Sequence, residues 1–202
     1  MQDTVIYVHG RGGSAQEAAH YEPLFANCAL VGLDYRTSTP WEAGREIREA
    51  VERIAEHANN LLLIANSIGA FFSMHAHLDT LVREAFFISP VVDMEALIAC
   101  MMACANVTEA QLERRGVIET GSGEPLSWEY LCYVRTHPVE WTAPTHILYG
   151  ENDALTPMET IRAFAHAHNA SLTVLKNGEH WFHTPEQMRF ADDWIRKARE
   201  HI

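Results

Sequence analysis

The sequence predicts an α/β fold with a mostly parallel central sheet of about six strands and helices on both faces. The first observation is a series of short apolar runs without a polar face, which are typical of strands covered on both sides. The second is that helical patterns lie between most of these runs, and this alternation indicates βαβ units. The runs are Val5–Val8, Ala29–Leu33, Leu61–Ile64, Ala85–Ile88, His146–Tyr149 and Ser171–Leu175.

The composition is that of an ordinary globular protein. The chain has 202 residues, of which 48% are hydrophobic and 21% are charged, and this suits one domain with a sizeable core. We therefore expect a single domain over residues 1–202. The connection formed by residues 91–142 is far longer than an ordinary link between strand and helix, so we expect it to be a lid-like insertion.

Charge and cysteine usage exclude several classes of partner. The formal net charge of -12 would repel a phosphate backbone, so no nucleic acid partner is expected. No apolar stretch approaches the roughly 20 residues of a transmembrane helix, and the first residues do not form a signal peptide. The four cysteines form no dense framework, which favours a reduced, cytoplasmic setting. Cys100 and Cys104 lie one turn apart on an apolar segment, where burial is expected.

Helix starts are marked by one recurring pattern. A serine or threonine that can cap a helix is followed three residues later by a glutamate or glutamine that can reach back to it, and three starts also have proline at the first helical position. These starts are Ser14 with Glu17, Thr39-Pro40 with Glu42, Thr108 with Gln111, Thr156-Pro157 with Glu159, and Thr184-Pro185 with Gln187. The pattern predicts a helix after each of them.

The insertion at residues 91–142 has two compatible interpretations. Its methionines and leucines recur at helical spacing, and a glycine-rich loop and an aromatic segment follow them. One interpretation is an extra helical layer that completes the core. The other is a lid in which Met101, Met102 and Trp128 line an apolar substrate pocket, since flexible methionine surfaces suit varied apolar ligands.

A serine stands at the end of the most apolar run. The run Leu61–Ile64 ends at Asn66 and Ser67, and Gly69 then begins a segment with helical character. A serine at the apex of such a strand-to-helix turn has its hydroxyl exposed beyond the sheet, and small neighbours allow the bend. Ala65 replaces the first glycine of the Gly-x-Ser-x-Gly pattern. An ordinary serine-glycine turn is the alternative.

The first strand ends in a second loop with functional character, His-Gly-Arg-Gly-Gly-Ser at residues 9–14. This loop lacks the Gly-Lys-Ser/Thr ending of the Walker pattern, and its glycines do not form Gly-x-Gly-x-x-Gly. Nucleotide binding is therefore disfavoured. Acyl transfer by a serine requires backbone donors for the oxyanion. The amides of Arg11 and Ile68 are the candidates.

The last two strands supply an acid and a base. Asp153 follows the strand at 146–149, and His180 follows the strand at 171–175. A serine needs a base within hydrogen-bond reach and a third group to orient that base. His183 is the alternative base, and we favour His180 because it directly follows the glycine turn. A metal site formed by His180, His183 and a carboxylate is disfavoured, because no second helix supplies a His-x-x-x-His or Cys-x-x-Cys set of ligands.

Together these segments resemble the α/β-hydrolase superfamily. The resemblance depends on His-Gly-x-Gly after the first strand, Ser67-x-Gly69 after the third, Gly-x-x-Asp153 after the fifth and His180 after the last. The order serine, aspartate, histidine is the one that this superfamily uses. The resemblance covers nearly the whole chain and is greatest with the small, single-domain, esterase-like serine hydrolases.

The resemblance implies a serine hydrolase that cleaves an ester or thioester of a small or medium acyl group. Ser67 would be the nucleophile, His180 the base and Asp153 the residue that orients it. No cofactor and no metal would be required, and the partner would be a small-molecule acyl substrate. An acyltransferase with the same triad and a non-catalytic binding protein of the same fold are the alternatives, and the oligomeric state is left open.

Overall fold

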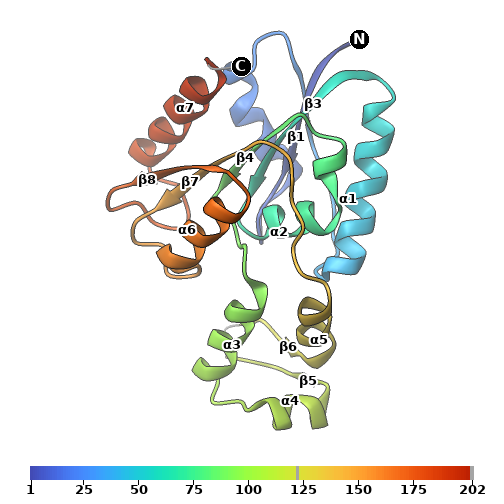
Figure 1. The fold of residues 1–202 in the computed structure, drawn as a ribbon, viewed down its shortest axis with the longest axis vertical. Helices are drawn as coiled ribbons and strands as arrows, with labels where there is room; N and C mark the ends of the chain where they lie inside the picture. Colours follow the sequence, from blue (N-terminus) through green and yellow to red (C-terminus); the bar gives the residue numbers. More distant parts are fainter. Residues whose placement is uncertain (122, 201–202) are drawn as a thin grey trace. The chain divides into compact units, whose positions relative to one another are not determined.

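The structure is a computed structural model that describes residues 1–121 and 123–200. Within these ranges its main sheet has six strands, all parallel, in the order β2-β1-β3-β4-β7-β8 (Figure 1). This confirms the predicted fold class and all six predicted strand positions. The strands are β1 (Gln2–Val8), β2 (Ala29–Gly32), β3 (Ala58–Asn66), β4 (Glu84–Ile88), β7 (Thr145–Gly150) and β8 (Ser171–Leu175).

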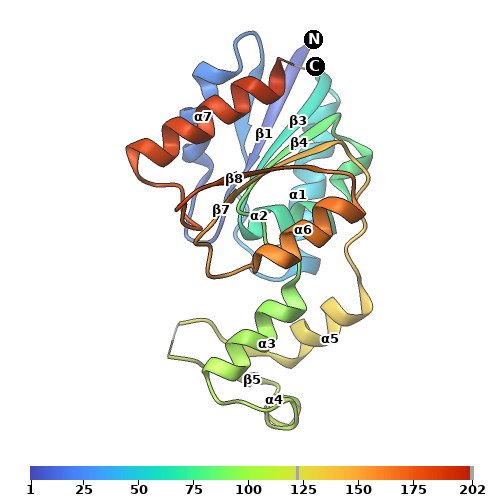
Figure 2. The ribbon, with the colours of Figure 1, turned by 60° about the vertical axis from the view of Figure 1, so that its left-hand side comes forward.

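Helices cover both faces of this sheet (Figures 1 and 2). The 3-10 helix η1 (Ala15–Leu24) and helix α7 (Pro185–Arg199) lie on one face, where Trp194 packs into a buried cluster with Tyr7 and Phe86. The other face carries α1 (Pro40–Ala55), α2 (Ile68–His75) and α6 (Met158–Ala167). The short helix η2 (Leu78–Thr80) precedes β4. Because both faces are covered, the central strands are apolar and buried over the segments Val5–Val8, Leu61–Ala65 and Ala85–Ile88.

The predicted helix starts are present, with one shift. Thr184 caps α7 by accepting a hydrogen bond from the Gln187 amide, and Pro40 is the first residue of α1. Helix α6 begins at Met158, one residue later than the pattern predicts, because Pro157 has the extended conformation of an N-cap, with a ψ of 145°. Every helix among residues 1–121 and 123–200 is too short or too polar to cross a membrane.

The chain divides into two compact units. The first contains residues 1–92 and the chain from residue 140 onwards, and the second contains residues 93–139. The second consists of α3 (Met94–Cys104), α4 (Glu109–Arg115), α5 (Trp128–Thr136) and the antiparallel pair β5 (Val117–Ile118) and β6 (Leu126–Ser127). Inside it, Arg135 of α5 forms ion pairs of 2.7 Å with Glu95 of α3 and Glu109 of α4, so one guanidinium joins its three helices. An insertion at 91–142 within a single domain stays a prediction.

The expected burial of Cys100 and Cys104 was wrong, because both are exposed. Helix α3 buries Met94, Ile98 and Met102, which are spaced four residues apart and form one narrow stripe. A residue two positions after a buried one is rotated by about 200° around a helix. Cys100 and Cys104 follow Ile98 and Met102 by two positions, so they face away from the stripe.

Candidate active site

Ser67 occupies a strained turn between β3 and α2. Its φ of 52° and ψ of -121° are unusual for any residue with a side chain, and such strain is found mostly at functional sites. A hydrogen bond from the Ser67 amide to the Ile88 carbonyl, 3.0 Å long, and another from the Val91 amide to the Ser67 carbonyl, 3.1 Å long, hold the turn against the end of β4. The backbone is therefore anchored on both sides of the serine.

The glycines around this turn are required by close backbone contacts. A Cβ atom at Gly69 would lie 2.4 Å from the His9 carbonyl oxygen, so helix α2 can approach the end of β1 only with glycine there. A Cβ atom at Gly10 would lie 3.2 Å from the Ser67 Cβ. The glycine-rich loop at 9–14 and the serine turn are thus in direct contact.

Asp153 is held in the loop after β7 with its side chain fully buried. Its Oδ1 accepts hydrogen bonds from the amides of Leu155 at 2.8 Å and Thr156 at 3.3 Å. Its Oδ2 is directed to Nδ1 of His180, 2.7 Å away. One oxygen therefore fixes the loop, and the other is available to the histidine.

His180 bridges the acid and the serine. Its Nδ1 lies 2.7 Å from Asp153 Oδ2, and its Nε2 lies 2.8 Å from Ser67 Oγ. Because an ionised carboxylate only accepts hydrogen bonds, Nδ1 carries the proton in the neutral ring and Nε2 accepts from the serine hydroxyl. The side chain is 20% exposed, so the imidazole is partly screened from water.

A glycine allows the loops of Asp153 and His180 to meet. A Cβ atom at Gly150 would lie 2.4 Å from the carbonyl oxygen of Glu179, the residue before His180. The Asn152 amide also donates a 2.7 Å hydrogen bond to the Gly178 carbonyl. The two loops are therefore joined backbone to backbone.

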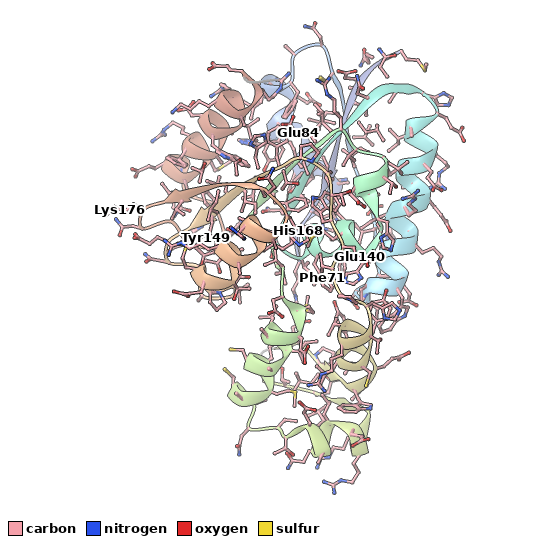
Figure 3. The ribbon with its side chains drawn as sticks, in the orientation of Figure 1. Phe71, Glu84, Glu140, Tyr149, His168 and Lys176 are labelled. Atoms are coloured by element: carbon pink, nitrogen blue, oxygen red, sulfur yellow. The ribbon has the colours of Figure 1, made fainter. Side chains whose placement is uncertain are left out.

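Tyr149, which is labelled in Figure 3, supports the loop that carries Asp153. Its hydroxyl donates a 2.6 Å hydrogen bond to the carbonyl of Thr156, the residue whose amide binds Asp153. Burial, followed by the charge of Asp153, raises the pKa of Tyr149 to about 12, so the phenol remains a neutral donor at physiological pH. This contact was not predicted, because Tyr149 reads in the sequence as one more apolar strand residue.

Three of the predicted site residues come together in space. Ser67, Asp153 and His180 form one hydrogen-bonded chain, whereas His183 Nδ1 donates to the Trp181 carbonyl oxygen, 2.8 Å away. No group of three or more histidine, cysteine or acidic side chains suited to a metal ion is found in the described part of the chain.

The other predicted site residues lie in two places. Arg11 is in the loop that contacts the serine turn, and Ile68 is the first residue of α2. Met101, Met102 and Trp128 belong to the second unit, where Met102 is buried and the other two are half-buried. Their role as a substrate pocket stays a prediction.

This chain has the α/β-hydrolase fold, as solved structures of similar architecture show. A hydrolase described as putative from Agrobacterium vitis S4 has a TM-score of 0.79 at 17% identity, covering 97% of this chain and 87% of that one. Est1E from Butyrivibrio proteoclasticus has a TM-score of 0.77 at 17% identity, covering 98% and 87%. The thioesterase domain from the curacin biosynthetic pathway has a TM-score of 0.59 at 14% identity, covering 97% and 91%. The sequence matches no protein-family model and no curated protein.

Proposed function

We propose that this protein is a serine hydrolase that cleaves a carboxylic ester or thioester through an acyl-enzyme. The observation that carries the proposal is the unbroken chain of hydrogen bonds from Ser67 Oγ through His180 to the buried Asp153 carboxylate, with distances of 2.8 and 2.7 Å. Esterase and thioesterase structures are among those with the same fold, which supports acyl chemistry at this position.

The reaction follows from the direction of these hydrogen bonds. Ser67 Oγ attacks the acyl carbon while His180 Nε2 takes its proton, and Asp153 stabilises the imidazolium that forms. The tetrahedral intermediate collapses, the bond to the leaving group breaks, and His180 returns the proton to the departing oxygen or sulfur. A water molecule then loses a proton to His180 and attacks the acyl carbon. The second tetrahedral intermediate collapses, the bond to Ser67 Oγ breaks, and His180 returns the proton to Ser67 Oγ as the acid leaves.

Two backbone amides are proposed to bind the oxyanion. The Ile68 amide is at the first position of α2, where an N–H has no acceptor within its own helix. The Arg11 amide follows Gly10, where an added Cβ atom would lie 3.2 Å from the Ser67 Cβ. Each such donor contributes about 10²- to 10³-fold in rate.

Met101, Met102 and Trp128 of the insertion are proposed to bind an apolar acyl chain, on the basis of their side-chain chemistry. Methionine is flexible and polarisable, so such a lining suits apolar chains of different lengths. Hydrolysis rates of p-nitrophenyl esters from acetate to decanoate test this proposal. We expect a preferred chain length, and a flat series would remove the support for the lining.

A fluorophosphonate probe tests the function itself. We expect covalent capture of the wild-type protein, with the adduct located on Ser67 by peptide mass spectrometry, together with turnover of p-nitrophenyl esters. Neither capture nor turnover would identify the chain as a non-catalytic binding protein of this fold. If an added alcohol outcompetes water for the acyl-enzyme, the protein is an acyltransferase with the same triad.

The Gly150→Ala variant is expected to lose both stability and activity. Its new methyl group would meet the Glu179 carbonyl at 2.4 Å and separate the loops of Asp153 and His180. Overpacking of this kind costs about 1–3 kcal/mol, and we expect kcat to fall at least ~10-fold because the triad is misplaced. Thermal melting and ester hydrolysis measure the two effects. Gly121→Ala is the control, because a Cβ atom there has no neighbour within 4 Å. Equal melting temperatures and equal kcat values in the two variants would contradict this prediction.

A further inference from the structure

We propose that Tyr7 and Glu17 are positioning residues. They hold the loop at residues 9–14 so that the Arg11 amide meets the oxyanion formed at Ser67. This inference rests on the proposed function and names residues that the mechanism above does not use. Neither side chain needs to touch the substrate. Their effect is to fix the distance between the loop and the serine turn.

Glu17 joins the loop to the strand below it. The buried Tyr7, 1% exposed on β1, donates its hydroxyl to Glu17 Oε2 at 2.6 Å. Glu17 Oε1 accepts a 3.2 Å hydrogen bond from the amide of Ser14, the last residue of the loop. The carboxylate therefore spans from the sheet to the loop, and its two oxygens have separate tasks.

The loop is folded directly onto this carboxylate. A Cβ atom at Gly13 would lie 2.8 Å from Glu17 Oε1 and 3.1 Å from the His9 Cβ. The Gly13 amide donates a 3.1 Å hydrogen bond back to the Gly10 carbonyl, which closes the loop into a tight turn. A displacement of Glu17 is therefore transmitted through this turn to Gly10 and to the amide that follows it.

The start of the loop is anchored independently. Tyr35 donates its hydroxyl to the His9 carbonyl at 2.7 Å, and its ring stacks on the His9 ring at a centroid distance of 4.3 Å. Because the start is fixed in this way, the Tyr7–Glu17 bond decides the position of the loop's far end. Gly10 lies between the two anchors, and a Cβ atom there would lie 3.2 Å from the Ser67 Cβ.

The charge state of Tyr7 supports a lasting contact. Burial and the neighbouring Tyr21 and Glu17 raise the pKa of Tyr7 well above its usual value, so the phenol stays a neutral donor. The Asn66 side chain acts on Tyr7 in the opposite sense, and Asn66 immediately precedes Ser67.

The test compares Tyr7→Phe and Glu17→Ala with the matched control Tyr21→Phe. Tyr21 is also buried and packs on Tyr7 with ring centroids 5.4 Å apart, but its hydroxyl has no hydrogen-bond partner within residues 1–121 and 123–200. For both test variants we expect kcat for a p-nitrophenyl ester to fall about 10-fold, since a misplaced oxyanion donor loses part of its effect. KM should stay within about twofold, because ground-state binding does not use the oxyanion contact.

An alkyl trifluoromethyl ketone reports on the oxyanion contact directly. It forms a hemiketal with Ser67 whose oxygen occupies the oxyanion position, so its inhibition constant should rise about 10-fold in the test variants and not in the control. The double variant Tyr7→Phe/Glu17→Ala should lose no more kcat than Glu17→Ala alone, because both substitutions break the same hydrogen-bonded connection. Melting temperatures are recorded for all variants.

The outcomes separate this inference from the proposed function. A wild-type protein that neither hydrolyses esters nor binds the ketone would overturn the proposed function. A wild-type protein that does both, with test variants that keep its kcat and inhibition constant, would overturn the positioning role and leave the function standing. A loss of kcat that merely follows the melting temperature, and that appears equally in Tyr21→Phe, would also overturn the positioning role.

Discussion

The His180→Ala variant is expected to lose about 10⁶-fold in kcat for ester hydrolysis, whereas His183→Ala should keep the wild-type rate. Without the imidazole, Ser67 loses the base that is hydrogen-bonded to its hydroxyl, and a neutral hydroxyl is a poor nucleophile. A residual acceleration of about 10³- to 10⁴-fold over water should remain, because the oxyanion donors and substrate binding are intact.

The two histidines form a matched pair for this test. They lie three positions apart, but His180 Nε2 is 2.8 Å from Ser67 Oγ, and His183 is 40% exposed with its Nδ1 at the Trp181 carbonyl oxygen. Initial rates with p-nitrophenyl esters and labelling of Ser67 by a fluorophosphonate are the measurements. A loss of both activities in His183→Ala, with His180→Ala unaffected, would reverse the assignment of the base.

The Asp153→Asn variant is expected to lose about 10⁴-fold in kcat while it remains folded. The orientation of the new amide is determined by its surroundings. The oxygen must take the place of Oδ1, because the amides of Leu155 and Thr156 both donate there. The NH₂ group then faces His180 Nδ1, which has to become an acceptor, so the ring proton moves to Nε2. A protonated Nε2 cannot accept the proton of Ser67.

Glu151→Gln is the control for this substitution. Glu151 is an exposed carboxylate two positions from Asp153, and its Oε2 accepts a 2.9 Å hydrogen bond from the Asn177 amide. A glutamine oxygen can accept the same bond, so kcat should stay within about twofold. Circular dichroism and thermal melting establish that both variants are folded. An Asp153→Asn protein with wild-type kcat would show that the carboxylate does not orient the histidine.

The strands of the fold were predictable because each is a short apolar run with both faces covered. The prediction for the second unit was less complete, because exposure around a helix depends on which neighbours are present. Cys100 and Cys104 demonstrate this: the apolar segment suggested burial, but α3 buries only the stripe of Met94, Ile98 and Met102. Periodicity locates a helix more reliably than it identifies the buried part of its surface.

The candidate site was predictable to the extent that it follows strand ends. Ser67, Asp153 and His180 each come directly after a predicted parallel strand, and such ends meet at one edge of the sheet. Their assignment as catalytic residues stays a prediction that the variants above test. The supporting tyrosines were not predicted, since Tyr7, Tyr35 and Tyr149 look like ordinary apolar positions and nothing local reveals where a hydroxyl is directed.

By itself, the sequence determined the alternation of strands and helices, the parallel sheet and the loops that carry Ser67, Asp153 and the two histidines His180 and His183. These are local properties of periodicity, capping and small residues at turns, and they depend on neighbours a few positions away. Only the tertiary structure decided that His180 and not His183 lies beside Ser67, that Gly150 lets two loops touch, and that Glu17 connects Tyr7 to the glycine loop. Hydrogen bonds of this kind require sub-ångström placement of groups far apart in the chain, and that placement is set by the packing of the whole domain.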